Sequence, residues 1–190
     1  GGYLDRGAAH LHPLNYALGL ARAAAQAGVR LFESSRVTAL DPAPRTAAGS
    51  VRADVVILAT NCYLGQLAPG VAARVMPINN FIVATEPLGA DRAAALIRDN
   101  RAVADSRFVV NYFRLTPDHR LLFGGGESYG WRFPRDIEAV VRPRMEAVFP
   151  QLRGVPVTHA WGGTLAITVN RMPAFQRLAP NLLSAAGYSG

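Results

Sequence analysis

Hydrophobic residues in the first part of the chain recur at helical spacing. In HPLNYALGLARAAAQAG (12–28), leucines and alanines return every few positions on one side of a helix. Pro13 suits the first helical turn, and Gly28 stands where helices often end, because glycine tolerates the left-handed conformation of that position. The pattern therefore predicts a helix over residues 12–28.

The next hydrophobic runs are shorter and have the spacing of strands. Strands are predicted over residues 29–34 and 36–40, followed by a turn region over 41–50 that contains prolines and a glycine. Residues 51–60 include an almost unbroken apolar stretch at 55–59. Such a stretch is typical of a strand buried on both faces, as in a parallel sheet.

After Pro69 the pattern becomes that of an antiparallel sheet with helices. Two strands flank a Thr-Pro-Asp-His turn within residues 107–126, since proline and aspartate favour turns. The helical spacing at 134–150 contains Pro143, which is expected to kink or split that helix. The other predicted elements are a long strand at 74–88, a helix at 91–100, a strand pair or bent strand at 157–168 and a last strand at 181–186.

The order of these elements predicts a mixed α/β protein of two interleaved domains. The first part has the helix and strands of a nucleotide-binding domain, and the middle is antiparallel. The end of the chain returns to the first pattern.

Composition narrows the function classes. Half of the 190 residues are hydrophobic, which favours a covered face, either in a homo-oligomer or against further parts of the same chain. The net charge is +7, but all 20 basic residues are arginines spread along the chain, so no nucleic-acid partner is expected. The absence of lysine excludes chemistry through a Schiff-base lysine.

Cysteine content and hydropathy exclude two further classes. Cys62 is the single cysteine, so these residues can form no internal disulfide and no cysteine metal cluster. No apolar run approaches the ~20 residues that span a bilayer, and no signal peptide opens the sequence. We therefore expect a soluble, cytoplasmic protein without a membrane span.

Two glycine-rich stretches fail the patterns of common active sites. Residues 124–126 are Gly-Gly-Gly, but Tyr129 occupies the last glycine position of a GxGxxG fingerprint begun at Gly124, so a flexible strand end is the preferred interpretation. Residues 187–190, Gly-Tyr-Ser-Gly, lack the residue that a hydrolase nucleophile elbow has between serine and its second glycine. A serine hydrolase is therefore not expected.

The histidines do not form a metal-binding pattern. His10 and His12 could bind a metal ion, but no third ligand lies near them in the sequence, so no metal site is predicted. His12 fits the start of the predicted helix and could also face a cleft. His119 and His159 are interpreted as surface or core histidines.

The stretch NYFR (111–114) places two polar side chains on one side of a strand. Alternation puts Tyr112 and Arg114 on one face and Asn111 and Phe113 on the other. A guanidinium fork matches a carboxylate, so this pair could hold an anionic or amide-bearing substrate. A solvent-facing pair on a sheet explains the spacing equally well.

Six stretches in this order resemble a known family: HLHPLNYALGLA (10–21), VVILATN (55–61), NNFIVATEPL (79–88), NYFRLTPDHRLLFGGGESYGWRFP (111–134), WGGTLAITVNRMPAF (161–175) and NLLSAAGYSG (181–190). Together they resemble the FAD-dependent oxidoreductases of the D-amino-acid oxidase superfamily, over essentially all 190 residues. Within that superfamily the likeness is greatest to the gamma-glutamylputrescine oxidoreductases.

The resemblance implies part of a Rossmann-like FAD-binding domain interleaved with a substrate domain on an antiparallel sheet. Residues 1–73 and 161–190 would belong to the FAD-binding domain and residues 74–160 to the substrate domain. The family's GxGxxG turn would precede Gly1 and is not among these residues. We therefore expect a fragment that on its own neither holds FAD tightly nor is active.

The resemblance also implies roles for individual residues. Glycine at 162 and 163, where covalent-flavin relatives carry a cysteine, implies non-covalent FAD. The implied FAD-binding residues are Val37, Ala59, Thr60, Asn61, Gly162, Gly163, Arg171, Met172, Gly187, Tyr188, Ser189 and Gly190. The implied substrate-binding residues are His12, Tyr112, Arg114 and Trp161.

The implied reaction is oxidation of a C–N bond in a small amine or amino acid, such as a gamma-glutamylputrescine-type substrate. Hydride passes to the flavin, and the imine hydrolyses to an aldehyde and ammonia while oxygen becomes hydrogen peroxide. No catalytic side chain is required. Two alternatives stay open: a quinone-linked amino-acid dehydrogenase and a cofactor-free binding module.

Overall fold

A computed structural model describes residues 2–41 and 43–188. The chain forms two compact units, Gly1–Ala53 and Asp54–Gly190. The three-part division at residues 73/74 and 160/161 stays a prediction. Among the described residues, no helix is long and apolar enough to cross a membrane.

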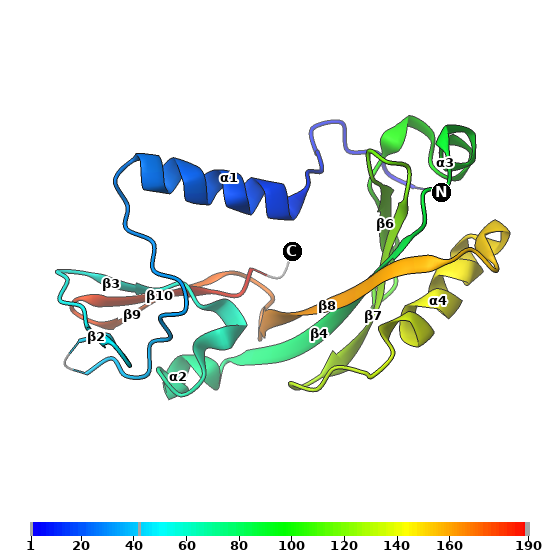
Figure 1. Ribbon diagram of the computed structural model, residues 1–190. Coiled ribbons are helices and arrows are strands. Elements are labelled where there is room, and N and C mark those ends of the chain that lie inside the picture. Colours follow the sequence, from blue (N-terminus) through cyan, green and yellow to red (C-terminus); the bar gives the residue numbers. More distant parts are fainter. Residues whose placement is uncertain (1, 42, 189–190) are drawn as a thin grey trace. The chain divides into compact units, whose positions relative to one another are not determined.

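The first unit is built around the predicted N-terminal helix, α1 (Pro13–Gln26) (Figure 1). His12 caps its start, since its Nδ1 accepts a hydrogen bond from the Asn15 N–H at 3.3 Å. Gly28 follows its end with φ +87°, a conformation that glycine adopts without strain. The turn region forms a small hairpin of β1 (Arg45–Thr46) and β2 (Gly49–Ser50).

The prediction of strands at 29–34 and 36–40 is wrong. Residues 29–34 belong to no strand, and the second segment makes a single bridge between Ala39 and Arg45. Leu31 and Phe32 are exposed. A strand needs a neighbour that takes up its backbone hydrogen bonds, and apolar content alone does not supply one.

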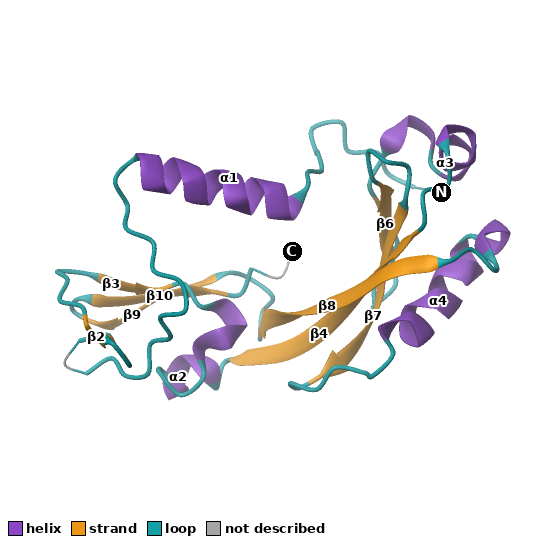
Figure 2. Cartoon of the chain, viewed as in Figure 1, coloured by secondary structure: helices purple, strands orange, loops and turns teal. Residues whose placement is uncertain are grey.

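The second unit contains a five-stranded antiparallel sheet with the order β5-β6-β7-β4-β8 (Figure 2). Its long strand β4 and its β6–β7 hairpin confirm the predicted strand at 74–88 and the predicted hairpin within 107–126. Its strands are β4 (Val75–Thr85), β5 (Val103–Ala104), β6 (Tyr112–Leu115), β7 (Leu121–Tyr129) and β8 (Val157–Thr168).

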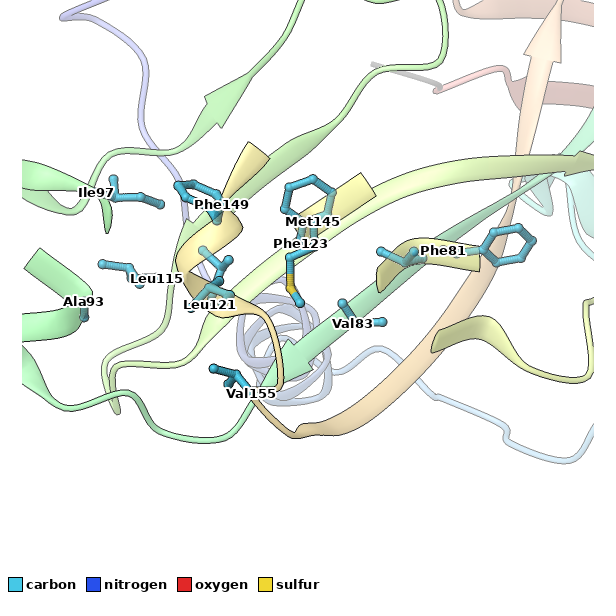
Figure 3. Packing of buried hydrophobic residues seen from close by; sticks show 12 residues of the cluster. Phe81, Val83, Ala93, Ile97, Leu115, Leu121, Phe123, Met145, Phe149 and Val155 are labelled. Carbon is cyan, nitrogen blue, oxygen red and sulfur yellow. The ribbon is translucent and has the colours of Figure 1, made fainter. Parts of the chain in front are cut away.

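Helix α4 (Ile137–Val148) covers one face of this sheet. Val141 and Met145 of the helix pack against Phe81, Val83 and Phe123 of the strands, all buried (Figure 3). Burial of such side chains contributes roughly 1.5–3 kcal/mol each. The remaining helices are α2 (Pro69–Ala72) and α3 (Ala90–Leu96), with 3₁₀ turns η1 (Asn61–Leu64), η2 (Arg98–Asn100) and η3 (Pro150–Leu152).

A smaller sheet has the order β3-β10-β9, with strands β3 (Val56–Leu58), β9 (Ala174–Ala179) and β10 (Leu182–Ala186). Strands β10 and β3 are parallel, as the hydrophobic pattern predicted, and β9 is antiparallel to β10. The predicted burial of β3 on both faces is wrong, because Leu58 is buried whereas Ile57 is exposed. Ser184, which pairs with Leu58, is also buried, so the face that carries these two residues is a covered face of the sheet.

Other predicted elements differ in detail. Helix α4 continues through Pro143 without a split. Strand β8 is one strand of 12 residues that pairs with β4 along most of its length. Strand β9 was not predicted, since Pro173 and the mixed polarity of 174–179 hide its alternation.

Candidate functional site

Two of the predicted FAD-binding segments meet at the carboxyl end of the parallel pair β3 and β10. Ala59 and Thr60 follow β3, and Asn61 begins η1. The Asn61 side chain accepts a hydrogen bond through Oδ1 from the backbone N–H of Gly187, which follows β10, at 3.0 Å. Ligands of α/β sheets bind at the carboxyl ends of parallel strands, so this is the expected place for a nucleotide cofactor.

The turn at Gly187 has no room for a side chain. Its φ of +85° favours glycine. A Cβ there would lie 2.5 Å from Thr168 Cγ2 and 3.3 Å from the carbonyl oxygen of Met172. Thr168 Oγ1 donates to that same carbonyl at 2.7 Å, so the segment 168–172 is packed against the turn. Tyr188 is half exposed, with its ring 6.2 Å from that of Phe175.

The predicted substrate-binding residues of the second unit lie on one face of the large sheet. We call the face that α4 does not cover the open face. Strand register places Trp161 opposite Ile82, Ile82 opposite Gly124, and Gly124 opposite Tyr112. Directly opposed residues in antiparallel strands point to the same face. Trp161 and Tyr112 therefore stand in one row across four strands.

Tyr112 is fixed within this row by two contacts. Its ring lies over Gly124, where any Cβ would collide with it. Its hydroxyl donates to Asn80 Oδ1, and Asn80 Nδ2 donates to the Gly126 carbonyl at 3.3 Å. Burial raises the pKa of Tyr112 to about 12, so its phenol stays neutral near pH 7.

Arg114 lies on the same face as Tyr112, as the strand alternation predicted. Phe113, between them, stacks on Phe123 in the core with ring centroids 5.5 Å apart. The Arg114 guanidinium is half-buried and donates through Nη1 to the Leu115 carbonyl at 3.3 Å. No acidic side chain of the described residues forms an ion pair with it.

A cavity of about 470 Å³ is built on the open face. Its apolar lining includes Ile78 of β4 and Leu165 of β8. Glu127 and Tyr129 line it from β7, and the Tyr129 hydroxyl donates to Glu127 Oε1 at 2.9 Å. That hydrogen bond raises the pKa of Tyr129.

Two arginines also line the cavity. Arg74 precedes β4, and Arg171 follows β8. Arg171 has φ +59°, and its guanidinium carbon lies 5.2 Å from the centre of the Phe108 ring. Because Thr168 and Arg171 both line this cavity, the segment packed on Gly187 is also a cavity wall.

The two glycines of β8 have different surroundings. A Cβ at Gly162 would lie 2.6 Å from the Phe133 ring and 2.9 Å from the Asn80 carbonyl, so a side chain cannot fit there. Gly163 pairs with Asn80 and has open space around it. The structure therefore leaves room over the open face at residue 163.

The other predicted residues belong to the first unit or lie outside the described residues. His12 and Val37 belong to the first unit, where His12 caps α1 and Val37 is half-buried outside any strand. Ser189 and Gly190 lie outside the described residues.

Asn80 and Glu127 were not among the residues predicted from the sequence. Asn80 meets Tyr112, and Glu127 lines the cavity, because of a strand register with a bulge that sets Asn80 opposite Glu127 and Ile82 opposite Gly124. Simple alternation along β7 would have put Glu127 and Gly124 on different faces of the sheet. The local signal was the Gly-Gly-Gly stretch, which is typical of a bulged strand.

The residues at the parallel strand ends fit FAD. The Asn61–Gly187 contact holds two chain turns together at the carboxyl ends of β3 and β10. The side chains of Ile57, Phe175 and Tyr188 are exposed and offer apolar surface for the flavin ring or the adenine of FAD. Ala59, Thr60, Asn61 and the 187–188 turn are the described residues that could hold it.

Comparison with known proteins gives the same family over the whole chain. Residues 1–190 match the family described as DAO, FAD dependent oxidoreductase. The chain is 45% identical to gamma-glutamylputrescine oxidoreductase of Escherichia coli and 41% identical to the probable oxidoreductase OrdL of Rhizobium meliloti. Both alignments cover 100% of this chain but 46% and 45% of the relatives, so the chain spans about half their length.

Solved structures show the same fold. L-proline dehydrogenase from P. horikoshii superposes with a TM-score of 0.73 at 21% identity, over 94% of this chain and 50% of that one. Glycine oxidase from Geobacillus kaustophilus gives a TM-score of 0.73 at 21% identity, over 90% of this chain and 47% of that one. With the family match over all 190 residues, these likenesses lead to one conclusion: the chain belongs to the DAO family of FAD-dependent oxidoreductases.

Proposed function

We propose that the protein, at its full length, is an FAD-dependent oxidoreductase that oxidises a C–N bond of a small amine or amino acid. One observation carries the proposal. The segment 168–172 packs against the Gly187 turn on one side and lines the 470 Å³ cavity of the open face on the other. The proposed cofactor turn and the substrate cavity therefore adjoin the same segment, and hydride transfer requires substrate and cofactor to be neighbours.

The proposed substrate is of the gamma-glutamylputrescine type, a slender amine chain with an amino-acid head. The 45% identity to the Escherichia coli enzyme of that name supports this choice. Arg114, which lacks a carboxylate partner among the described residues, would hold the head's carboxylate in a bidentate fork. Tyr112 and Trp161 would wall the channel, and the half-exposed Trp161 ring could lie against an amine.

The proposed cofactor is non-covalent FAD, which when bound would accept the hydride from the carbon that carries the amine. No cysteine stands at Gly162 or Gly163, and the described chain's single cysteine, Cys62, is buried with its Sγ 3.0 Å from the Thr164 carbonyl. Acid precipitation of the holoenzyme should therefore release the flavin into the supernatant. Flavin that stays with the precipitated protein would contradict non-covalent binding.

Substrate oxidation by the purified full-length holoenzyme tests the function. With gamma-glutamylputrescine, we expect oxygen and water to be consumed while an aldehyde, ammonia and hydrogen peroxide appear in equal amounts. Reduction of a quinone-like dye without oxygen uptake would favour a dehydrogenase. A full-length protein that binds no flavin would contradict the proposal and favour a binding module.

A further inference from the structure

We infer that Glu127 binds the terminal ammonium group of the substrate's amine chain on the open face. The inference rests on the proposed function, because it names how the amine end of that substrate is recognised. Glu127 lines the 470 Å³ cavity, and Tyr129 holds its carboxylate through a hydrogen bond of 2.9 Å. No basic side chain of the described residues forms an ion pair with it.

The hydrogen bond from Tyr129 goes to one carboxylate oxygen of Glu127, and among the described residues no ion pair engages the other. A carboxylate held by one donor and half-buried beside an apolar cavity floor is a ready acceptor for a cation. The neighbouring Tyr112 hydroxyl donates to Asn80, so its oxygen can also accept from an ammonium. Asn80 is opposite Glu127 in the strand register.

The spacing along the sheet suits a substrate with charges at both ends. Arg114 is opposite Leu122, which is opposite Ala84, whereas Glu127 is opposite Asn80. Asn80 and Ala84 are four positions apart on β4, which at strand geometry is roughly 13 Å. An extended chain of about ten bonds between an amine and a carboxylate spans roughly 12 Å. The acidic and basic residues therefore stand about one such molecule apart.

The row of Trp161 and Tyr112 lies between the two charged positions, because Ile82 falls midway between Asn80 and Ala84. An apolar methylene chain would cross this row. Arg171 lies near enough for its charge to act on Tyr129, but neither cavity arginine of the described residues forms an ion pair with Glu127. In the chain, Arg74 precedes β4 and Arg171 follows β8. The open face thus offers a carboxylate for the amine, an aromatic row for the chain and a guanidinium for the head.

Binding to the reduced holoenzyme tests the inference without oxidation of the ligand. Full-length enzyme reduced with dithionite under nitrogen would be titrated calorimetrically with gamma-glutamylputrescine and with gamma-glutamyl-n-butylamide, which lacks the terminal amine. Glu127→Gln should weaken binding of the first ligand by about ten- to hundredfold and leave binding of the second nearly unchanged. Glu138→Gln, on the helix that covers the other face of the sheet, is the matched control and should bind both ligands like the wild type.

Three results would overturn the inference. Glu127→Gln could bind both ligands as the wild type does, it could bind both of them equally more weakly, or the wild type could show no preference for gamma-glutamylputrescine over gamma-glutamyl-n-butylamide. Oxygen uptake by the wild type with the same substrate is measured in parallel. Normal turnover together with unchanged binding by Glu127→Gln leaves the proposed function standing and rejects the role of Glu127. A wild type that oxidises no amine rejects the proposed function itself.

Discussion

Asn61 Oδ1 accepts a hydrogen bond of 3.0 Å from the backbone N–H of Gly187, across 126 residues of sequence. The bond ties the turn after β3 to the turn after β10 at the carboxyl end of the parallel pair. Asn61 has φ +50°, a left-handed conformation that asparagine tolerates better than most residues. We propose that this contact shapes the floor on which the flavin lies.

Removing the Asn61 side chain should loosen this contact without adding backbone strain if glycine replaces it. Asn61→Gly is expected to lower the free energy of unfolding by about 1 kcal/mol and to weaken FAD binding in the full-length protein. Denaturant unfolding and flavin fluorescence measure the two effects. Asn61→Asp keeps both the acceptor and the left-handed tolerance, so its free energy of unfolding should stay near the wild type. A glycine variant that binds FAD like the wild type would remove the contact from the cofactor site.

A methyl group at residue 187 should disrupt the same turn. Gly187→Ala meets both the positive φ and the 2.5 Å approach to Thr168 Cγ2, so we expect a loss of about 1–3 kcal/mol in the free energy of unfolding. Gly163→Ala is the matched control, because a Cβ there meets nothing within 4 Å. Its free energy of unfolding should be unchanged or slightly raised. Equal stabilities of the two variants would contradict the packing at Gly187.

Local sequence signals predicted the elements that depend on neighbouring residues. Pro13, His12 and Gly28 marked α1, and the Thr-Pro-Asp-His turn marked the β6–β7 hairpin. Segment 29–34 failed because strand formation depends on a partner, which apolar residues such as Phe32 do not reveal. The burial of Ile57 failed for the same kind of reason, since what covers a sheet face is not encoded in the strand itself.

In the candidate site, too, the sequence predicted what depends on one strand and not what depends on strand pairing. Alternation along one strand correctly put Tyr112 and Arg114 on one face and Phe113 on the other. Trp161 lies on this face because of how four strands pair. Glu127 lies there because of a bulge in which Gly126 has φ +83°. Sequence spacing carries no direct record of that register. The assigned ligand roles of these residues stay predictions.

The phenol of Tyr112 should titrate far above its ordinary range. Its folded pKa of about 12 exceeds the ordinary value near 10, so burial favours the protonated form. The folded state then keeps this contribution fully below pH 10 and loses it as the pH rises through 12. In ultraviolet titration, the component missing from Tyr112→Phe should have its midpoint about 12. A missing component with a midpoint near 10 would contradict the burial of Tyr112 over Gly124.

Replacing the guanidinium of Arg114 should weaken substrate binding while sparing the cofactor. Arg114→Lys keeps the charge but loses the bidentate fork, so the full-length enzyme should show a KM raised by about ten- to hundredfold with flavin binding unchanged. Arg98→Lys, on an exposed side chain, is the control and should leave KM unchanged. Steady-state kinetics decides the matter, because an unaltered KM in the Arg114 variant makes it an ordinary surface residue of β6.

We propose that, in the full-length protein, an amine bound on the open face passes hydride to FAD held at the ends of β3 and β10. The most direct measurement is anaerobic mixing of the oxidised full-length holoenzyme with gamma-glutamylputrescine while the visible absorption of the flavin is recorded. We predict that this absorption bleaches in a single turnover, and that gamma-glutamyl-n-butylamide, without the terminal amine, leaves it oxidised. Flavin that stays oxidised with gamma-glutamylputrescine and with other amines and amino acids would contradict the account.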